Sequence, residues 1–320
     1  YMKMFQVSFE ERDQVLRPLA ESGNEAVGSM GDDTPMAVLS RKERSLYDYF
    51  RQKFAQVTNP PIDPLRETIV MSLETDLGTE KNIFTEGPEH AERVSLTSPV
   101  LSQSKFNTLL QLDRPGFGIA RIDCTFKPAE KSLAQAVKDA AEAAEQAVRD
   151  GATILVLSDR AIEADVLPVH SLLATGAVHH HLIQCGLRTQ ANLMVESASA
   201  RDSHQVACLL GFGATASYPY LAYSVLEDLI RTGEVLGEPS TCYKNYRKGI
   251  NKGLLKIMSK MGISAVSSYR GAQLFEAVGL AGDVIDLAFC GVASRIEGAG
   301  FDDLDRELRA TGRRAWSQRK

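Results

Sequence analysis

The sequence predicts an α/β protein, an incomplete or distorted (β/α) TIM-like barrel that follows an irregular, mainly helical N-terminal segment. From about Gly116 onward, apolar strand-like runs alternate with helical runs, which is typical of a parallel sheet with covering helices. Runs such as ATILVL (152–157) are short and nearly continuously apolar, as a sheet buried on both faces requires. Roughly four or five such units stand where a complete barrel needs eight, and an open doubly wound parallel sheet is the alternative.

The first part of the chain, residues 1–105, is predicted to be irregular and helical. Helical patterns cover 9–21, 41–56 and 64–74, and the prolines of TNPPIDP (58–64) impose extended or turn geometry between the last two. The βα-repeat part covers 106–300. Its Ala-rich helix around 134–148 places apolar side chains on one face, as in a helix lying on a sheet; these are Leu133, Val137, Ala140, Ala141, Ala144 and Val148.

Composition and charge exclude several classes of partner. The 36 Lys and Arg residues against 41 Asp and Glu give a net charge of -5, so we expect neither nucleic acid nor an anionic membrane as a partner. The sequence has no apolar run long enough to span a membrane and no signal peptide pattern at its start. These observations predict a cytoplasmic protein.

The cysteines and histidines do not predict a metal site. The five cysteines are odd in number and far apart, without CxxC pairs, which favours free thiols; they are Cys124, Cys185, Cys208, Cys242 and Cys290. The adjacent histidines His179, His180 and His181 point about 100° apart on a helix and cannot share one ion. We therefore predict no metal ligands.

Polar residues follow two of the predicted strands. Ser158, Asp159 and Arg160 end the ATILVL strand, and Glu196 ends the NLMV strand. Arg188, followed by Thr189, is expected at a comparable position, so that these side chains converge on a small cleft. No Ser/His/Asp or Cys/His set has a recognisable spacing, so we predict no catalytic residue. A self-sufficient barrel enzyme or a small-molecule binding module is the alternative function.

The glycine-rich stretch GFGATA (211–216) follows a helix and precedes a strand. A dinucleotide-binding fingerprint has the reverse context, because it follows a strand and opens a helix. The pattern is typical of a helix C-terminus capped by Gly211 or Gly213. A flavin-phosphate site at this turn is the alternative, and we predict no residue that binds a cofactor.

Five longer motifs carry a resemblance to a known family. They are GSMGDDTPMA (28–37), DYFRQKFAQVTNPPIDPLRE (48–67), SPVLS (98–102), LIQCGLRTQANLMVESASARDSHQVACLLGFGATASYPYLAY (182–223) and INKGLLKIMSKMGISAVSSYRGAQLFEAVGL (250–280). Over about 23–300 the chain resembles the central domain of bacterial, plastid and fungal glutamate synthases.

The resemblance implies a function that is shared among several domains. In this family an N-terminal glutaminase domain with a terminal Cys nucleophile releases ammonia, and an FMN domain with a 3Fe–4S cluster adds it to 2-oxoglutarate and reduces the product to L-glutamate. A β-helix ends the chain. The central domain is expected to link the glutaminase and FMN domains and to form part of the ammonia tunnel, with no catalytic centre of its own. Residues 301–320 are then a linker toward the FMN domain.

Cofactors and partners follow from the same resemblance. No Cys opens this sequence, no cysteines cluster, and the flavin-binding barrel is missing, so we expect a piece of the enzyme without a cofactor. The parent enzyme is expected to hold FMN and a 3Fe–4S cluster, with FAD and 4Fe–4S in a small electron-donating subunit if it is NADPH-type. The acidic composition and the missing transit peptide favour the NADPH-type enzyme.

The resemblance also places two segments against the glutaminase domain and along the tunnel. The passage must exclude water, because ammonia that escapes becomes ammonium and loses its nucleophilic lone pair. Small and hydroxyl side chains with rigid prolines suit such a path. The predicted tunnel or interface residues are Gly28, Ser29, Met30, Gly31, Asp32, Asp33, Thr34, Thr58, Asn59, Pro60 and Asp63.

Overall fold

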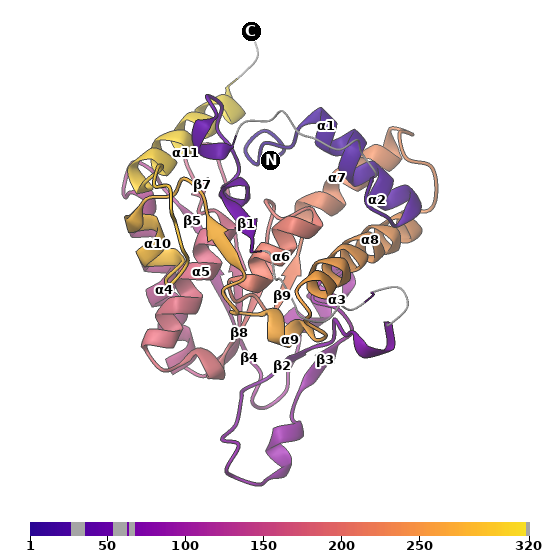
Figure 1. Cartoon of the computed structure of the whole chain (residues 1–320), viewed down its shortest axis with the longest axis vertical. Helices are drawn as coiled ribbons and strands as arrows, with labels where there is room; N and C mark the ends of the chain where they lie inside the picture. Colours follow the sequence, from indigo (N-terminus) through magenta and orange to yellow (C-terminus); the bar gives the residue numbers. More distant parts are fainter. Residues whose placement is uncertain (27–35, 54–62, 64–67, 318–320) are drawn as a thin grey trace.

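The computed structural model describes residues 1–26, 36–53, 63 and 68–317 (Figure 1). The predicted helix at 9–21 is confirmed: it begins as α1 (Phe9–Glu11), continues through one π-helical stretch, η1 (Arg12–Leu16), and ends as α2 (Arg17–Ser22). The Ser8 hydroxyl caps its start by accepting from the Glu11 amide at 3.0 Å. Gly23, with φ 65°, ends it in the left-handed conformation that glycine tolerates.

The predicted helix at 41–56 is wrong over its described part. A 3₁₀ turn, η3 (Leu46–Tyr49), leads into strand β1 (Phe50–Gln52), which pairs antiparallel with β10 (Phe275–Ala277). Phe50 is fully buried, with its ring 4.9 Å from that of Phe212. These contacts with distant residues outweigh the local helical pattern. Another 3₁₀ turn, η2 (Ala37–Leu39), precedes this region.

The predicted helix at 64–74 is also wrong where the chain is described. Its residues form only a 3₁₀ turn, η4 (Thr68–Val70), before β2 (Thr75–Leu77). This strand pairs antiparallel with β3 (Val94–Leu96), and a further turn, η5 (Pro88–Ala91), lies in the connection. Helix α3 (Gln103–Leu110) follows.

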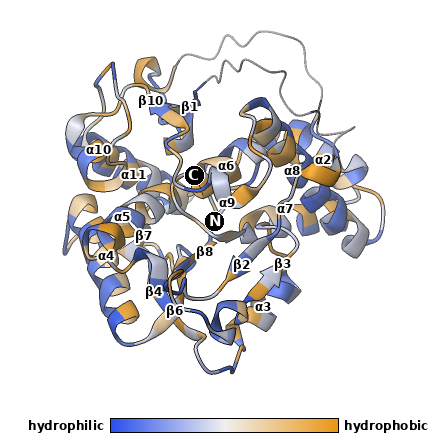
Figure 2. Ribbon diagram, turned by 60° about the horizontal axis from the view of Figure 1, so that its bottom comes forward, coloured by the Kyte–Doolittle hydropathy of each residue, from blue (hydrophilic) through white to orange (hydrophobic). Residues whose placement is uncertain are grey.

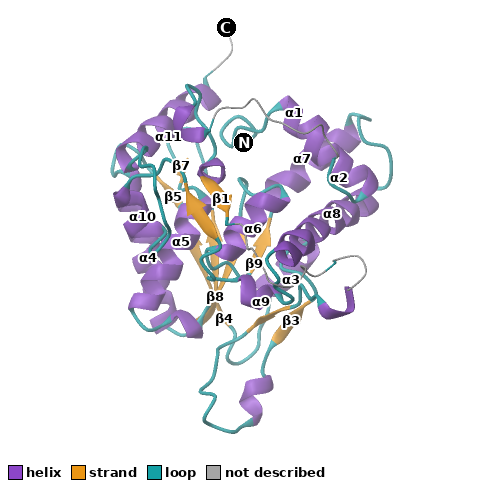
Figure 3. Ribbon diagram, in the orientation of Figure 1, coloured by secondary structure: helices purple, strands orange, loops and turns teal. Residues whose placement is uncertain are grey.

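A parallel sheet forms the centre of the molecule, as the sequence predicts. Its strands are β4 (Gly118–Asp123), β6 (Ala152–Ser158), β8 (Asn192–Glu196) and β9 (Ala216–Tyr218), in that order. The crossovers contain α4 (Leu133–Arg149), α5 (Ser171–Gln184) and α6 (Ser203–Gly211). The order of the described strands never reverses, whereas a doubly wound sheet needs such a reversal. Figure 3 shows the strands in the interior with helices around them.

Two short pairings extend the sheet region. Strands β5 (Thr125–Phe126) and β7 (Leu167–Pro168) form an antiparallel pair. In the SPVLS motif, Val100 forms a parallel bridge to Ser217 of β9. This motif therefore lies beside the last strand of the sheet.

Helix α4 shows how the sequence pattern becomes packing. Its side chains predicted to face the sheet are all buried, together with Ala136. Small residues on this face let α4 pack closely against α5 and against strands β4, β5 and β6. Figure 2 shows the apolar and polar residues of the surrounding helices.

The remaining helices complete the structure. They are η6 (Arg188–Gln190), α7 (Tyr220–Arg231), α8 (Pro239–Lys260), α9 (Val266–Tyr269), α10 (Gly282–Ala288) and α11 (Phe301–Trp316). Helix α8 packs on α2, α10 on α5, and α11 on α4. Residues 301–316 thus form a packed helix, while the division of the chain into domains stays a prediction. Within the described ranges, no helix is both long and apolar enough to cross a membrane.

Candidate functional site

A cleft of about 1440 Å³ lies between the N-terminal segment, the loop before η3, the strand-end loops and α11. Helices α1 and α11 lie at the same end of the molecule, with the N-terminus between them (Figure 1). Residues from the carboxyl ends of the strands reach this cleft, where α/β proteins usually place functional groups. These residues are His170, Ser199 and Arg201.

A buried ion pair forms one wall of the cleft. The Arg201 guanidinium donates to both carboxylate oxygens of Glu11 and, at 2.7 Å, to the carbonyl of Ala198. Because Arg201 is only 5% exposed, this pair is well shielded from solvent. It joins the loop after β8 to the first helix, so the two distant segments form a single wall.

A cluster of buried hydroxyl groups lies behind the cleft. The Tyr47 hydroxyl is 2.9 Å from Ser171 Oγ, which is 2.6 Å from Ser199 Oγ and accepts from Ser197 Oγ at 2.9 Å. Burial raises the pKa of Tyr47 well above its ordinary value, so its hydroxyl stays protonated. The hydroxyl groups therefore satisfy one another's hydrogen bonds.

His170 lies next to this cluster but is not arranged as a general base. Its Nδ1 accepts a hydrogen bond from the Leu172 amide at 3.2 Å, so the proton of the neutral ring sits on Nε2, 3.5 Å from Ser45 Oγ. A protonated Nε2 cannot take a proton from Ser45. Burial, with a contribution from Arg201, also lowers the pKa of His170 to about 3. The ring therefore serves as the N-cap of α5.

The predicted strand-end residues Ser158, Arg160 and Glu196 do come together. Glu196 is 2% exposed, and its carboxylate accepts from Ser158 Oγ at 2.7 Å, from Arg160 at 3.2 Å and from Arg121. Both carboxylate oxygens of Glu196 therefore accept from charged or hydroxyl donors. These residues hold the ends of β4, β6 and β8 together.

Asp159 follows strand β6 directly after Ser158, but its side chain contacts Ala198 and not Glu196. It is 1% exposed, and both carboxylate oxygens lie 3.1 Å from the amide nitrogen of Ala198. Burial raises the pKa of Asp159 to about 7, and the hydrogen bond from Ala198 opposes that rise. Asp159 orders the loop after β8.

The expectation that Arg188 joins these residues is wrong. Arg188 precedes β8, and its guanidinium donates to His179 Nδ1 at 2.8 Å and to the carbonyls of Ala191 and Gly213. Because Ala191 and Gly213 precede β8 and β9, Arg188 and its neighbour Thr189 lie at the amino ends of the strands, opposite Glu196. The CGLRTQ segment, predicted to lie at the end of a strand, instead precedes β8.

The glycine-rich stretch GFGATA is the helix C-terminus that the sequence predicts. Gly213 has φ 112°, its amide donates to the Leu210 carbonyl, and the Ala214 amide donates to the Leu209 carbonyl, which is the Schellman arrangement. A Cβ on Gly213 would lie 2.3 Å from His179 Nδ1. The space beside the turn is filled by a side chain, so the turn does not fit a flavin phosphate.

The cysteines do not fit an iron–sulfur cluster. Cys124 and Cys208 are buried, and burial raises the pKa of the Cys124 thiol to about 12 and that of Cys208 well above its usual range. In the described parts of the chain, the one cluster of metal-ligating residues contains a single cysteine. We derive no flavin or cluster chemistry from these residues. That the chain binds neither group stays a prediction.

Most of the predicted tunnel residues lie outside the described residues. These are Gly28, Ser29, Met30, Gly31, Asp32, Asp33, Thr34, Thr58, Asn59 and Pro60. Asp63 is described and half-buried. Leu39 and Ser40, which follow the GSMGDDTPMA segment closely in the chain, line the cleft.

The residues that line the cleft at its strand-end side are not among those predicted from the sequence. Ser199 and Arg201 stand in the SASAR stretch directly after the β8 strand, which is the signal that identifies them. The contribution of Glu11 could not be found in this way, because it is 190 positions away from Arg201.

The fold and the site define an α/β protein with a parallel sheet whose described strand-end charges are held in internal contacts. The glutamate synthase central domain family matches residues 1–281. The chain belongs to this family.

Curated relatives agree with the family match. The chain is 44% identical, over 99% of its length, to the chloroplastic ferredoxin-dependent glutamate synthase of Oryza sativa subsp. japonica. It is 43% identical over 95% of its length to the NADH glutamate synthase of Schizosaccharomyces pombe, and 41% identical over 98% to the NADPH glutamate synthase large chain of Bacillus subtilis. The chain spans 20%, 15% and 20% of these three proteins, respectively.

Solved structures give a weaker match. A flavocytochrome b2 mutant with benzoylformate aligns with 62% of this chain and 47% of its own, at 14% identity and a TM-score of 0.37. A score at this level supports no inference about fold or function.

Proposed function

We propose that this chain acts as the central domain of a glutamate synthase, an oxidoreductase that makes L-glutamate from glutamine and 2-oxoglutarate. In this proposal the domain links the glutaminase and FMN domains and forms part of the wall of the ammonia passage. The observation that carries it is the identity of 41–44% over nearly the whole chain to three glutamate synthases. Because the chain covers at most a fifth of each, the remaining domains supply the chemistry.

The internal contacts of the described residues support a connecting role. Glu196, Asp159 and Arg188 each hold loops or strand ends, and His170 caps a helix. Contacts of this kind position backbone and strand ends. Such a domain contributes shape, and its function exists in the assembled enzyme.

The cleft supports a role in the passage of ammonia. Ammonia retains its nucleophilic lone pair only if it is kept from bulk water, so a passage needs walls with hydrogen-bonding groups of modest polarity. Ser199 lines the cleft and belongs to the hydroxyl cluster, while Leu39 and Ser40 continue from the predicted GSMGDDTPMA segment.

The experiment is Asn59→Ala in the full-length enzyme, with glutamine hydrolysis and glutamate formation measured together. Widening the passage lets ammonia escape, so hydrolysis exceeds glutamate formation. Asn107→Ala, at an exposed position of α3, is the matched control and keeps the ratio of the parent enzyme. A ratio of one to one in the Asn59 variant would count against a tunnel role.

A small-molecule binding module is the second candidate, and the cleft favours it. A volume of about 1440 Å³ is more than sufficient for an amino or keto acid. Thermal-shift measurements with glutamine, glutamate, 2-oxoglutarate and FMN test it. Stabilisation by one of them, abolished by changing a cleft residue, would replace the connecting role with a binding role.

We also propose that the sheet is part of an incomplete (β/α) barrel. Four parallel strands in chain order, each joined to the next by a helix-containing crossover, support this arrangement. The cytoplasmic location and an NADPH-type parent enzyme with a small electron-donating subunit remain predictions. Cell fractionation tests the first, and assays of the full-length enzyme with NADPH, NADH and reduced ferredoxin test the second.

A further inference from the structure

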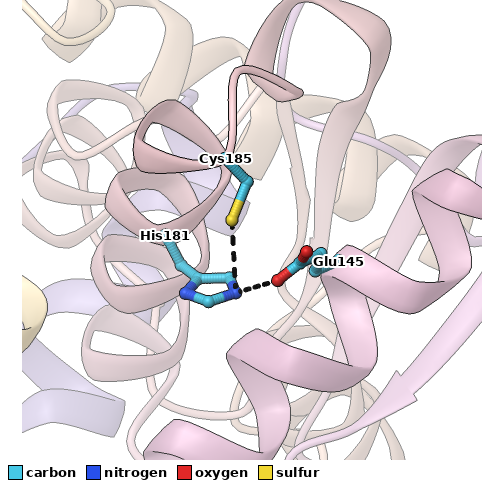
Figure 4. Close-up of side chains that lie close together, drawn as sticks. All are labelled: Glu145, His181 and Cys185. Carbon is cyan, nitrogen blue, oxygen red and sulfur yellow. Dashed lines mark hydrogen bonds and ion pairs between the residues drawn. The ribbon is translucent and has the colours of Figure 1, made fainter.

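Three side chains of different chemistry meet between helices α4 and α5, away from the cleft. Glu145 extends from α4, while His181 and Cys185 extend from α5 and its C-cap (Figure 4). His181 Nε2 lies 2.6 Å from Glu145 Oε2 and 3.8 Å from Cys185 Sγ. One potential ligand atom from each residue falls within 4.8 Å of the other two.

The two helices hold this cluster in place. His181 and Cys185 are four positions apart, the spacing that brings side chains together on one helix face. Helix α4 packs against α5 through its small residues, which brings Glu145 next to His181. The cluster therefore does not depend on a flexible loop.

Arg149 orients the carboxylate of Glu145. It contacts Glu145 Oε1 through Nε at 2.8 Å and through Nη2 at 2.7 Å, while Oε2 faces His181. A neighbour that occupies one carboxylate oxygen and leaves the other for a ligand is a common arrangement around protein metal sites.

We propose that Glu145, His181 and Cys185 bind a zinc ion, with a water molecule as fourth ligand. Zinc takes thiolate, imidazole and carboxylate ligands at about 2.0–2.3 Å in a tetrahedron, so neighbouring ligand atoms lie about 3.3–3.8 Å apart. The separation of His181 Nε2 and Cys185 Sγ already fits. The shorter distance between His181 and Glu145 widens as their hydrogen bond is replaced by two bonds to the metal.

His179 and His180 do not take part. His179 Nδ1 accepts from Arg188 at the amino end of the sheet. The proposed site combines one histidine, His181, with a cysteine one helical turn later.

Zinc binding displaces the thiol proton of Cys185. Cys185 coordinates as a thiolate, so its Sγ–H bond breaks, the sulfur keeps the electron pair for the metal, and the proton goes to solvent. The ring nitrogen that ligates must be neutral. Apparent affinity consequently rises with pH, and zinc binding releases protons to a weakly buffered solution.

Cobalt(II) titration of the purified chain, kept reduced, tests the site because tetrahedral cobalt with a thiolate ligand absorbs in both the visible and the near-ultraviolet. We expect one cobalt per chain, displaced by one zinc. Cys185→Ser abolishes the near-ultraviolet thiolate band, and His181→Gln and Glu145→Gln weaken binding on the order of 10-fold or more. Circular dichroism verifies that each variant is folded.

Two matched controls separate the site from adventitious binding. His180→Gln changes the neighbouring histidine of the same helix, and Cys290→Ser removes an exposed cysteine outside the cluster. Both are expected to keep the parent spectrum and stoichiometry. A thiolate band that survives in Cys185→Ser, or that disappears in Cys290→Ser, would overturn the proposal. So would the absence of any tetrahedral cobalt spectrum in the parent chain, which would leave Glu145 and His181 as a hydrogen-bonded contact between two helices.

Discussion

Arg201 and Glu11 form a two-pronged ion pair that joins the loop after strand β8 to the first helix of the chain. The side chains are 6% and 18% exposed, respectively, so solvent screens the pair only weakly. Removal of one partner leaves the other charge partly buried without compensation, which costs more than the pair itself contributes.

Arg201→Ala is expected to lower the free energy of unfolding by about 3–5 kcal/mol, because it leaves the partly buried carboxylate of Glu11 without its charged partner. Urea-induced unfolding followed by circular dichroism measures the change. Arg231→Ala is the control: Arg231 is 75% exposed in its ion pair with Asp228, so its loss is expected to cost about 0.5 kcal/mol or less. Equal losses in the two variants would contradict the role given to the buried pair.

Gly213→Ala tests the turn between α6 and β9. The new Cβ would lie 2.3 Å from His179 Nδ1 on a residue with φ 112°, so strain and overlap together are expected to cost about 2–4 kcal/mol. Gly186→Ala changes a glycine with φ 69° and open space around it, and is expected to cost about 1 kcal/mol. Thermal and urea unfolding compare the two, and a Gly213 variant no less stable than the Gly186 variant would disprove the steric argument.

Asp159→Asn is expected to change how stability depends on pH. The pKa of Asp159 is raised to about 7 in the folded chain from an ordinary value of 3.8. Between pH 3.8 and pH 7 the folded state keeps a proton that the unfolded state has lost. The stability that the protonated Asp159 carboxyl contributes is therefore fully present below pH 3.8 and is lost as the pH rises through 7. The slope is at most about 1.4 kcal/mol per pH unit.

Asparagine does not ionise and retains an oxygen that can accept from the Ala198 amide. Measured by urea unfolding from pH 4.5 to 8, the Asn variant should therefore gain stability relative to the parent as pH rises toward 7. Asp113→Asn, at an exposed carboxylate, supplies the comparison. A constant difference between Asp159→Asn and the parent over this range would refute the raised pKa.

Titration of the purified chain with FMN is expected to show no saturable binding. The glycine turn at 211–216 is filled by His179, and a parallel assay of the chain with glutamine and 2-oxoglutarate is expected to show no turnover. Fluorescence and product assays make these measurements. Stoichiometric FMN binding or any glutamine hydrolysis would mean that the chain contains an active centre.

Local sequence patterns were enough to predict the fold class and some individual strands, helices and turns. The apolar run at 152–157 and the Ala-rich face of α4 predict their structures because burial in a parallel sheet dictates composition along a short stretch. The same is true of the turn at Gly213, whose conformation depends on neighbouring backbone atoms. The family resemblance likewise rests on the order of residues along the chain.

Long-range contacts decided the rest. The sequence does not reveal that 50–52 pair with 275–277 as strands, since that pairing depends on partners more than 200 positions away. Nor does it separate Arg188 from Glu196, because the two stand eight positions apart and only the direction of β8 puts them at opposite edges of the sheet. The same reason explains two other contacts, between Glu11 and Arg201 and between Glu145 and His181. The sequence determines the type of each side chain, but only the packing of helices and strands brings the partners close together.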